Sequence, residues 1–305
     1  MKNPETPWFP TDLLGKIVDE CSWDNETLLA CALVNHALRE LSLPHLFRKV
    51  ELTNLEKGKV SNLASTSPEA FIEFMKFAPH LLNHIQTITV SCERDVQSWF
   101  RKSSKELVYI LNSIPRPSSF VLAVTSSVPR STRLSWPLLP SEFKEALIKL
   151  FRSTTLKTIS IAGLVTFPFT LFNEFSSSVN QLALMDSDPT TLISLPAPPD
   201  QALMPHNSTT RPKLKELYLV PYVDEQGMKI YPSVHWLLSS PNCRLDFSQL
   251  AALYLAGHWP YSTTDEADFL RILHMLSKPL KHLSFHGGLL SKLQLLTHFT
   301  QRSFR

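Results

Sequence analysis

The sequence predicts an α/β fold in which a short all-helical segment, residues 1–52, precedes an irregular α/β solenoid with parallel strands, residues 53–305. Three observations lead to this prediction. Short apolar helical patterns fill the first fifty residues, a six-residue strand pattern recurs along the rest of the chain, and segments with helical spacing separate the strand patterns. Alternation of strands and helices favours a parallel sheet with helices on its other side.

The first predicted helix begins near Pro10, because proline is tolerated in the first turn of a helix. Its apolar residues recur at helical spacing: Leu13, Leu14, Ile17 and Val18. Asp24 or Asn25 suits the N-cap of the second helix. The third is expected over residues 38–43, ending before Pro44, because a proline restricts the residue before it to extended backbone.

The second helix carries the run 28–34, which is apolar on every side. A helix of this kind needs cover all round. A unit of about 45 residues, however, is near the lower limit for forming a core of its own. We therefore expect something outside the unit to cover it. Residues 45–52 then lead into an extended segment.

Two stretches of this segment resemble the F-box motif. Residues 9–18 (FPTDLLGKIV) look like its opening, usually written L-P-x-E-[LI]-[LI]-x-x-I, and residues 28–41 (LLACALVNHALREL) look like its second helix. Three positions depart from the pattern, with Phe9 in place of Leu, Asn35 in place of Cys, and Leu38 where an aromatic residue is common. The resemblance is to F-box-like proteins that are abundant in mushroom-forming fungi.

This resemblance implies a protein-docking surface. In F-box proteins these helices bind a Skp-type adaptor, which connects them to a cullin and a RING ubiquitin ligase in an SCF-type complex. The residues that match adaptor-facing positions are Pro10, Leu13, Leu14, Ile17, Leu29, Leu33 and Val34. Packing within the helical unit is the alternative role for these side chains, and a plain helical cap is the alternative for the segment.

A strand-like unit, apolar at positions 1, 4 and 6, appears six times after the helical segment. Its first positions are Ile85, Leu156, Val179, Leu214, Leu250 and Leu280. A seventh, weaker unit covers residues 120–124. The pattern is the L-x-x-L-x-L core of a leucine-rich repeat. The units from 156 to 280 are 23 to 36 residues apart, mostly longer than ordinary repeats, so a globular α/β domain with coincidental matches is the alternative.

Helices and turns are expected between these units. Helical patterns cover residues 68–77, 94–111, 141–151, 170–175, 232–238 and 264–276. The loops predicted from Pro and Ser content are 116–119 with 126–140, and a longer insertion at about 186–212. The insertion is either a partner contact or a passive surface excursion. Gly163, Gly257 and Gly287 each stand at position eight of a unit, where the chain is expected to turn off the sheet.

Composition argues against several classes of function. Only 7 of the 305 residues are glycine, and neither phosphate-binding pattern, G-x-G-x-x-G or G-x-x-x-x-G-K-[ST], occurs. The net charge of +3, with no run of Lys or Arg longer than two, argues against a nucleic-acid partner. The N-terminus has neither a secretory signal pattern nor an apolar run long enough for a membrane span, so an intracellular protein with no membrane partner is expected.

We predict no catalytic residue, cofactor or metal site. G-x-S-x-G and H-E-x-x-H are absent, and His282 and His286 would lie about 13 Å apart on one strand, too far to share a metal. Cys243 with His235 is a pairing that chance produces in chains of this size. The sequence therefore predicts a non-catalytic substrate receptor of a cullin-RING ubiquitin ligase, with the target protein bound by the repeat region. The alternatives are a repeat scaffold whose N-terminal helices only cap the solenoid, and a hydrolase with an unrecognised site.

Overall fold

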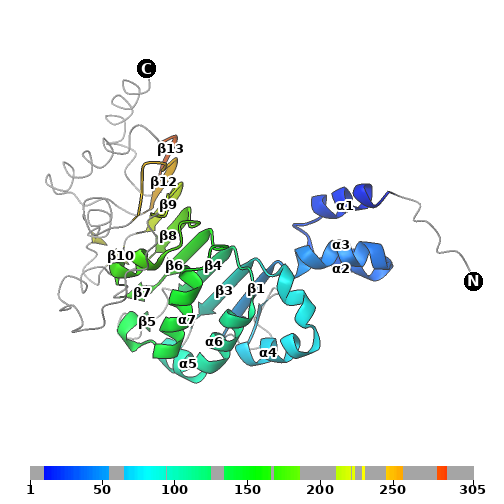
Figure 1. The fold of residues 1–305 in the computed structure, drawn as a ribbon, viewed down its shortest axis with the longest axis horizontal. Coiled ribbons are helices and arrows are strands. Elements are labelled where there is room, and N and C mark those ends of the chain that lie inside the picture. The colour runs from blue at the N-terminus through cyan, green and yellow to red at the C-terminus, as the bar shows by residue number, and fades with distance from the viewer. Residues whose placement is uncertain are drawn as a thin grey trace, which may run out of the picture.

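A computed structural model describes residues 10–54, 65–93, 95–124, 134–165, 168–185, 211–220, 222–223, 229–230, 245–256 and 280–286. Over these ranges the chain has the predicted α/β fold, with a nine-stranded sheet in which all neighbouring strands are parallel. Three helices stand beyond one end of the sheet, and further helices cover one of its faces (Figure 1).

The N-terminal helices are α1 (Thr11–Glu20), α2 (Asn25–Val34) and α3 (His36–Leu46). Asp24 caps α2, and its side chain accepts a hydrogen bond from the Glu26 N–H. The expectation that the third helix ends before Pro44 is wrong, because α3 continues to Leu46. A proline this close to the end removes only one helical hydrogen bond, and the Phe47 N–H still donates to the Leu43 carbonyl at 3.0 Å.

All seven predicted strand units form strands of the large sheet. The strands in spatial order are β13 (His282–His286), β12 (Ala252–Ala256), β9 (Glu216–Val220), β8 (Gln181–Met185), β6 (Thr158–Ala162), β4 (Ser119–Val124), β3 (Thr87–Cys92), β1 (Lys49–Thr53) and β2 (Ser65–Thr66). Strand β1 is the extended segment predicted after the third helix, and β2 is a strand that we did not predict. The boundary between units at residue 52 stays a prediction.

The strands align so that positions 4 and 6 of every unit form two continuous rows across the sheet. The position-4 row is Val50, Ile88, Phe120, Ile159, Leu182, Leu217, Leu253 and Leu283. These side chains are buried or packed against the core, together with helix residues such as Leu107, Phe143 and Leu147. The two rows therefore form the face of the sheet that the helices cover, as period-2 alternation requires.

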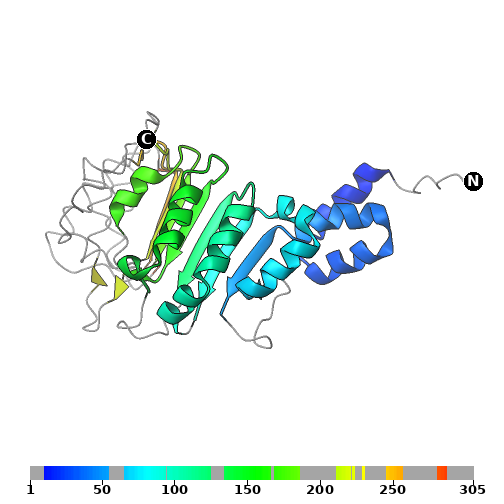
Figure 2. The same ribbon diagram turned by 60° about the horizontal axis from the view of Figure 1, so that its bottom comes forward.

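The helices on this face are α4 (Pro68–Phe77), α5 (Val96–Lys102), α6 (Ser104–Ser113) and α7 (Ser141–Phe151), which Figure 2 shows in front of the sheet. Two predicted helices, 68–77 and 141–151, match α4 and α7. The single helix expected over 94–111 is wrong, because α5 closes with the Ser103 N–H on the Trp99 carbonyl and α6 begins at Ser104. Apolar spacing continues across this break, so periodicity alone does not reveal it.

Short elements complete the described chain: η1 (Pro79–His84), η3 (Trp136–Leu138), η4 (Phe169–Glu174), β5 (Leu134–Ser135), β7 (Leu164–Val165), β10 (Tyr222–Val223) and β11 (Lys229–Ile230). The helix expected at 170–175 is thus a 3-10 helix. The loop expected at 126–140 contains β5 and η3, which a Pro-rich stretch does not signal. The helices expected at 232–238 and 264–276 lie outside the described residues, as does the insertion except for residues 211–212.

Gly163 turns the chain off the sheet after β6, as its place in the unit predicts. Its φ angle is +69°, and a Cβ at this position would stand 2.2 Å from the Val124 carbonyl oxygen. Only glycine fits such a left-handed conformation in contact with another strand. Gly257 and Gly287, predicted to turn in the same way, lie outside the described residues.

Candidate functional site

The apolar side chains that we predicted for adaptor binding lie mostly on the surface of the helical unit. Leu33 is 87% exposed, Val34 69%, and Leu13 and Ile17 47% each. Pro10 and Leu29 are also exposed, whereas Leu14 is half-buried. Large apolar side chains exposed at the surface are typical of protein interaction sites.

These side chains are exposed because the helical unit has a very small core. Among residues 10–46, which contain α1, α2 and α3, Val18, Leu28 and Ser42 are fully buried. Helices α1 and α2 both pack on α3, and among the described residues much of the side of each helix that faces away from α3 is exposed. Leu13 and Ile17 are four residues apart on α1, as are Leu29 and Leu33 on α2. Residues at this spacing share one face, so each helix presents an apolar ridge.

Trp23, in the turn between α1 and α2, belongs to the same exposed apolar set and is missing from our predicted residues. Its side chain is 84% exposed. Tryptophan is enriched among the residues that contribute most to binding in protein interfaces. Its exposure could have been predicted from its position in a turn between two predicted helices, because such a position offers no helical face against which the ring could pack.

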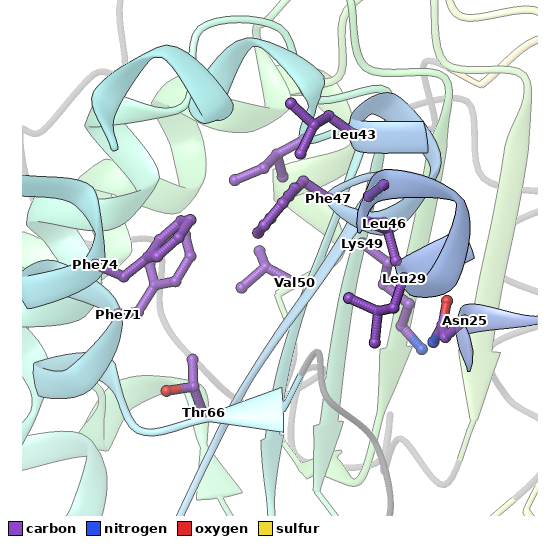
Figure 3. A pocket seen from close by; sticks show the side chains of 12 residues that line it. Asn25, Leu29, Leu43, Leu46, Phe47, Lys49, Val50, Thr66, Phe71 and Phe74 are labelled. Atoms are coloured by element: carbon purple, nitrogen blue, oxygen red, sulfur yellow. The ribbon is translucent and has the colours of Figure 1, made fainter. Parts of the chain in front are cut away.

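A pocket of about 440 Å³ lies at the base of the helical unit, between α2 and α3 on one side and α4, β1 and β2 on the other (Figure 3). It is lined by Asn25, Leu29, Ala32, Leu43, Leu46, Phe47, Lys49, Val50, Thr66, Phe71, Phe74 and Ile85. The Phe47 and Phe74 rings stack across the junction with centroids 5.5 Å apart, and Phe71 stacks on Phe74 at 5.7 Å. Sequence reasoning missed the pocket because its walls are separated along the chain.

The face of the sheet away from the helices, here called the open face, carries a second group of aromatic side chains. Tyr218 on β9 and Tyr254 on β12 are direct neighbours whose rings stack at 4.1 Å and 3°. The His282 ring lies 5.1 Å from that of Tyr254. Tyr218 Oη donates a hydrogen bond to Glu216 Oε2 at 3.2 Å. Burial, more than this contact, raises the pKa of Tyr218, so the phenol stays a neutral donor.

The part of the chain that the structure describes holds no group of three or more His, Cys, Asp or Glu residues able to bind a metal ion. Cys243 and His235, the pair weighed as a thiol site, lie outside the described residues. Of the helices described, none has the length and apolar character needed to cross a membrane. Comparisons with protein-family models, with curated proteins and with solved structures find no match for this chain.

Proposed function

We propose that this chain is an F-box-like substrate receptor of a cullin-RING ubiquitin ligase. The observation that carries the proposal is the exposure of Leu33 and Val34 on α2, together with Leu13 and Ile17 on α1. These residues lie within the stretches that resemble the F-box, at positions where that family contacts a Skp-type adaptor.

The energetics support a docking role for these helices. Covering an exposed Leu, Val or Ile side chain contributes about 1.5–3 kcal/mol. Several such side chains, with the exposed Trp23 in addition, exceed the lower estimates of association cost, about 4 kcal/mol. The adaptor would thus supply the cover that the helical unit lacks.

We infer further that the sheet is an irregular, leucine-rich-repeat-like solenoid. Two observations support this. The long strands follow one another in chain order from β1 to β13, all parallel, and positions 4 and 6 of each unit stay aligned across the sheet. Repeat proteins of this kind use one extended face for binding.

The open face is the proposed target surface. Tyrosine is enriched in protein interfaces because its ring offers a large contact area and its hydroxyl a hydrogen bond. The stacked Tyr218 and Tyr254 and the nearby Glu216 present both kinds of group. The receptor would then act by proximity, holding the target near the ubiquitin-loaded enzyme so that transfer becomes effectively intramolecular.

The test is binding of the full chain to a purified Skp-type adaptor, measured by calorimetry. We expect Leu33→Asp and the double variant Leu13→Asp/Ile17→Asp to weaken binding at least tenfold, because each places a charge in an apolar contact. Leu138→Asp is the matched control, since Leu138 is 48% exposed but lies in η3, away from the helical unit. Absence of wild-type binding, or equal loss with the control, would contradict the proposal.

The alternative role, in which the helices only cap the end of the sheet, makes a different prediction. A cap would keep its amides protected in the isolated chain. The large exposure of α2 favours the adaptor role instead. Amide exchange over residues 10–52 distinguishes the two, because the adaptor role predicts fast exchange that slows only when the adaptor is added.

A further inference from the structure

The pocket between the helical unit and the sheet has one apolar end and one polar end. Phe71, Val50 and Ile85 at its inner wall are buried. Asn25 and Lys49 are exposed lining residues, and in Figure 3 they lie with Leu29 on the side opposite Phe71 and Phe74. The mouth of the pocket therefore carries an ammonium and a carboxamide, whereas the rest of its lining is hydrocarbon and aromatic surface apart from Thr66.

This pocket is much larger than the voids of an ordinary protein interior, which seldom exceed a water molecule. Its volume of about 440 Å³ falls in the range of small-molecule sites, about 300–1,000 Å³. Mostly apolar lining with a few placed polar groups is also the composition of such sites.

The charge at the mouth of the pocket determines which kind of molecule it can bind. Among the described residues, no acidic side chain pairs with Lys49. Glu51, on the same strand, accepts hydrogen bonds from Ser65 at 2.8 Å and Ser91 at 3.0 Å, so its carboxylate already has partners. An ammonium at the mouth of an apolar pocket favours an anionic head group, and the Asn25 amide can donate to the same group.

We propose that this pocket binds a small amphipathic carboxylate, with its hydrocarbon part against Phe71 and Phe74 and its head group at Lys49 and Asn25. Of the residues proposed to bind the adaptor, Leu29 also lines the pocket, whereas Leu13, Ile17 and Leu33 do not, so variants at these three positions test the adaptor surface separately. Both α2 and α3 on one side and α4 and β1 on the other contact such a ligand, which would therefore fix the helical unit against the sheet.

The experiment is calorimetric titration of the full chain with dodecanoate below its micellar concentration. We expect saturable binding of one molecule per chain, and at least tenfold weaker binding of dodecyltrimethylammonium, which has the same chain and the opposite head charge. Lys49→Gln should weaken dodecanoate binding at least tenfold. Lys16→Gln, an exposed lysine on α1, is the matched control and should bind as the wild type does.

Three outcomes would overturn the proposal: no saturable binding, equal affinity for the two head groups, or wild-type affinity in Lys49→Gln. Ala32→Phe, which fills the pocket from α2, tests whether a protein partner occupies the pocket instead of a small molecule. If it weakens binding of the adaptor while dodecanoate does not bind the wild type, the pocket belongs to a protein interface and the proposal is wrong. Leu33→Asp should abolish adaptor binding and leave dodecanoate binding intact, so the two proposals fail separately.

Discussion

The three N-terminal helices and the parallel sheet place their apolar side chains in opposite ways. In the sheet, positions 4 and 6 of the strands from β1 to β9 form rows of buried Val, Ile, Leu and Phe under a layer of helices. In α1 and α2, side chains of the same kind point outward, and Leu33 is 87% exposed. Similar composition therefore leads to a core in one region and to an open surface in the other.

The difference teaches that apolar content alone does not define a core. In the sheet, the apolar residues of each strand lie beside those of the next strand, and a layer of helices covers them. Among the described residues, α1 and α2 make their main contacts with α3. We expect mutations in the sheet to change stability and mutations of the exposed helical residues to change binding.

The largest expected effect is that of Gly163→Ala in the sheet. The new Cβ would meet the Val124 carbonyl oxygen at 2.2 Å in a backbone with φ of +69°, so the substitution should lower the free energy of unfolding by about 3 kcal/mol or more. Urea unfolding of the full chain, followed by circular dichroism, measures it.

Gly15→Ala, in the middle of α1, is the matched substitution in the helical unit. The nearest atom to its new Cβ would be Leu41 Cδ2 at 4.0 Å, so we expect stabilisation by about 0.5–1 kcal/mol. If both alanine variants lower the free energy of unfolding equally, the backbone of α1 is packed as tightly as that of the sheet, and the contrast between the two regions is wrong.

The second prediction compares two leucines. Leu182 is fully buried on β8 between Ile159 and Leu217, so Leu182→Ala should cost about 2–5 kcal/mol through lost burial and a cavity. Leu33→Ala should change stability by less than about 0.5 kcal/mol, as surface substitutions do. The same urea titration measures both, and a large loss for Leu33→Ala would mean that α2 is covered within the chain itself.

The strands of the sheet could be predicted because their pattern is local. Three apolar residues at positions 1, 4 and 6 mark most of the strands, and alternation with helices predicts that they are parallel, whereas their order and register are seen only in the structure. Strand β2 could not be predicted, since two residues, Ser65 and Thr66, carry no pattern. The break between α5 and α6 at Ser103 could not be predicted either, because the apolar spacing continues through it.

The candidate functional site could be predicted only in part. Exposure of the α2 residues could be foreseen from a helix that is apolar on all sides in a unit too small to cover it. The pocket could not, because it exists only where Phe47, at the end of α3, meets Phe71 and Phe74 of α4. Such a junction depends on the angle between two regions, and no periodicity within either region encodes that angle.

A smaller effect is expected from Ser42, which is fully buried in α3 without a hydrogen-bond partner for its Oγ among the described residues. Ser42→Ala keeps the volume and removes the unsatisfied hydroxyl, so we expect stabilisation by about 1 kcal/mol. Ser104 at the start of α6 is in the same situation in the sheet region, which makes Ser104→Ala the matched variant. Thermal unfolding measures both, and a loss of stability in either would show that its hydroxyl has a partner.

The smallest expected effect is the pH dependence of the α2 cap. The Thr27 hydroxyl donates to Asp24 Oδ2 at 2.5 Å, and this bond, helped by backbone N–H donors, holds the pKa of Asp24 below its usual value. The fold therefore favours the ionised carboxylate. Its contribution is present above the unfolded pKa, near 3.9, and disappears as the pH falls through the lower folded value.

We expect Asp24→Ala to lower the melting temperature slightly at pH 7 and to have less effect below about pH 4. Asp24→Asn is the control, since an asparagine side chain can cap a helix without titrating. Asn35 already does so for α3 by accepting the Leu38 N–H at 2.9 Å. A pH-dependent difference between the wild type and Asp24→Asn, absent between Asp24→Asn and Asp24→Ala, would assign the effect to the carboxylate. The same pH dependence of the melting temperature in all three proteins would place the titrating group elsewhere.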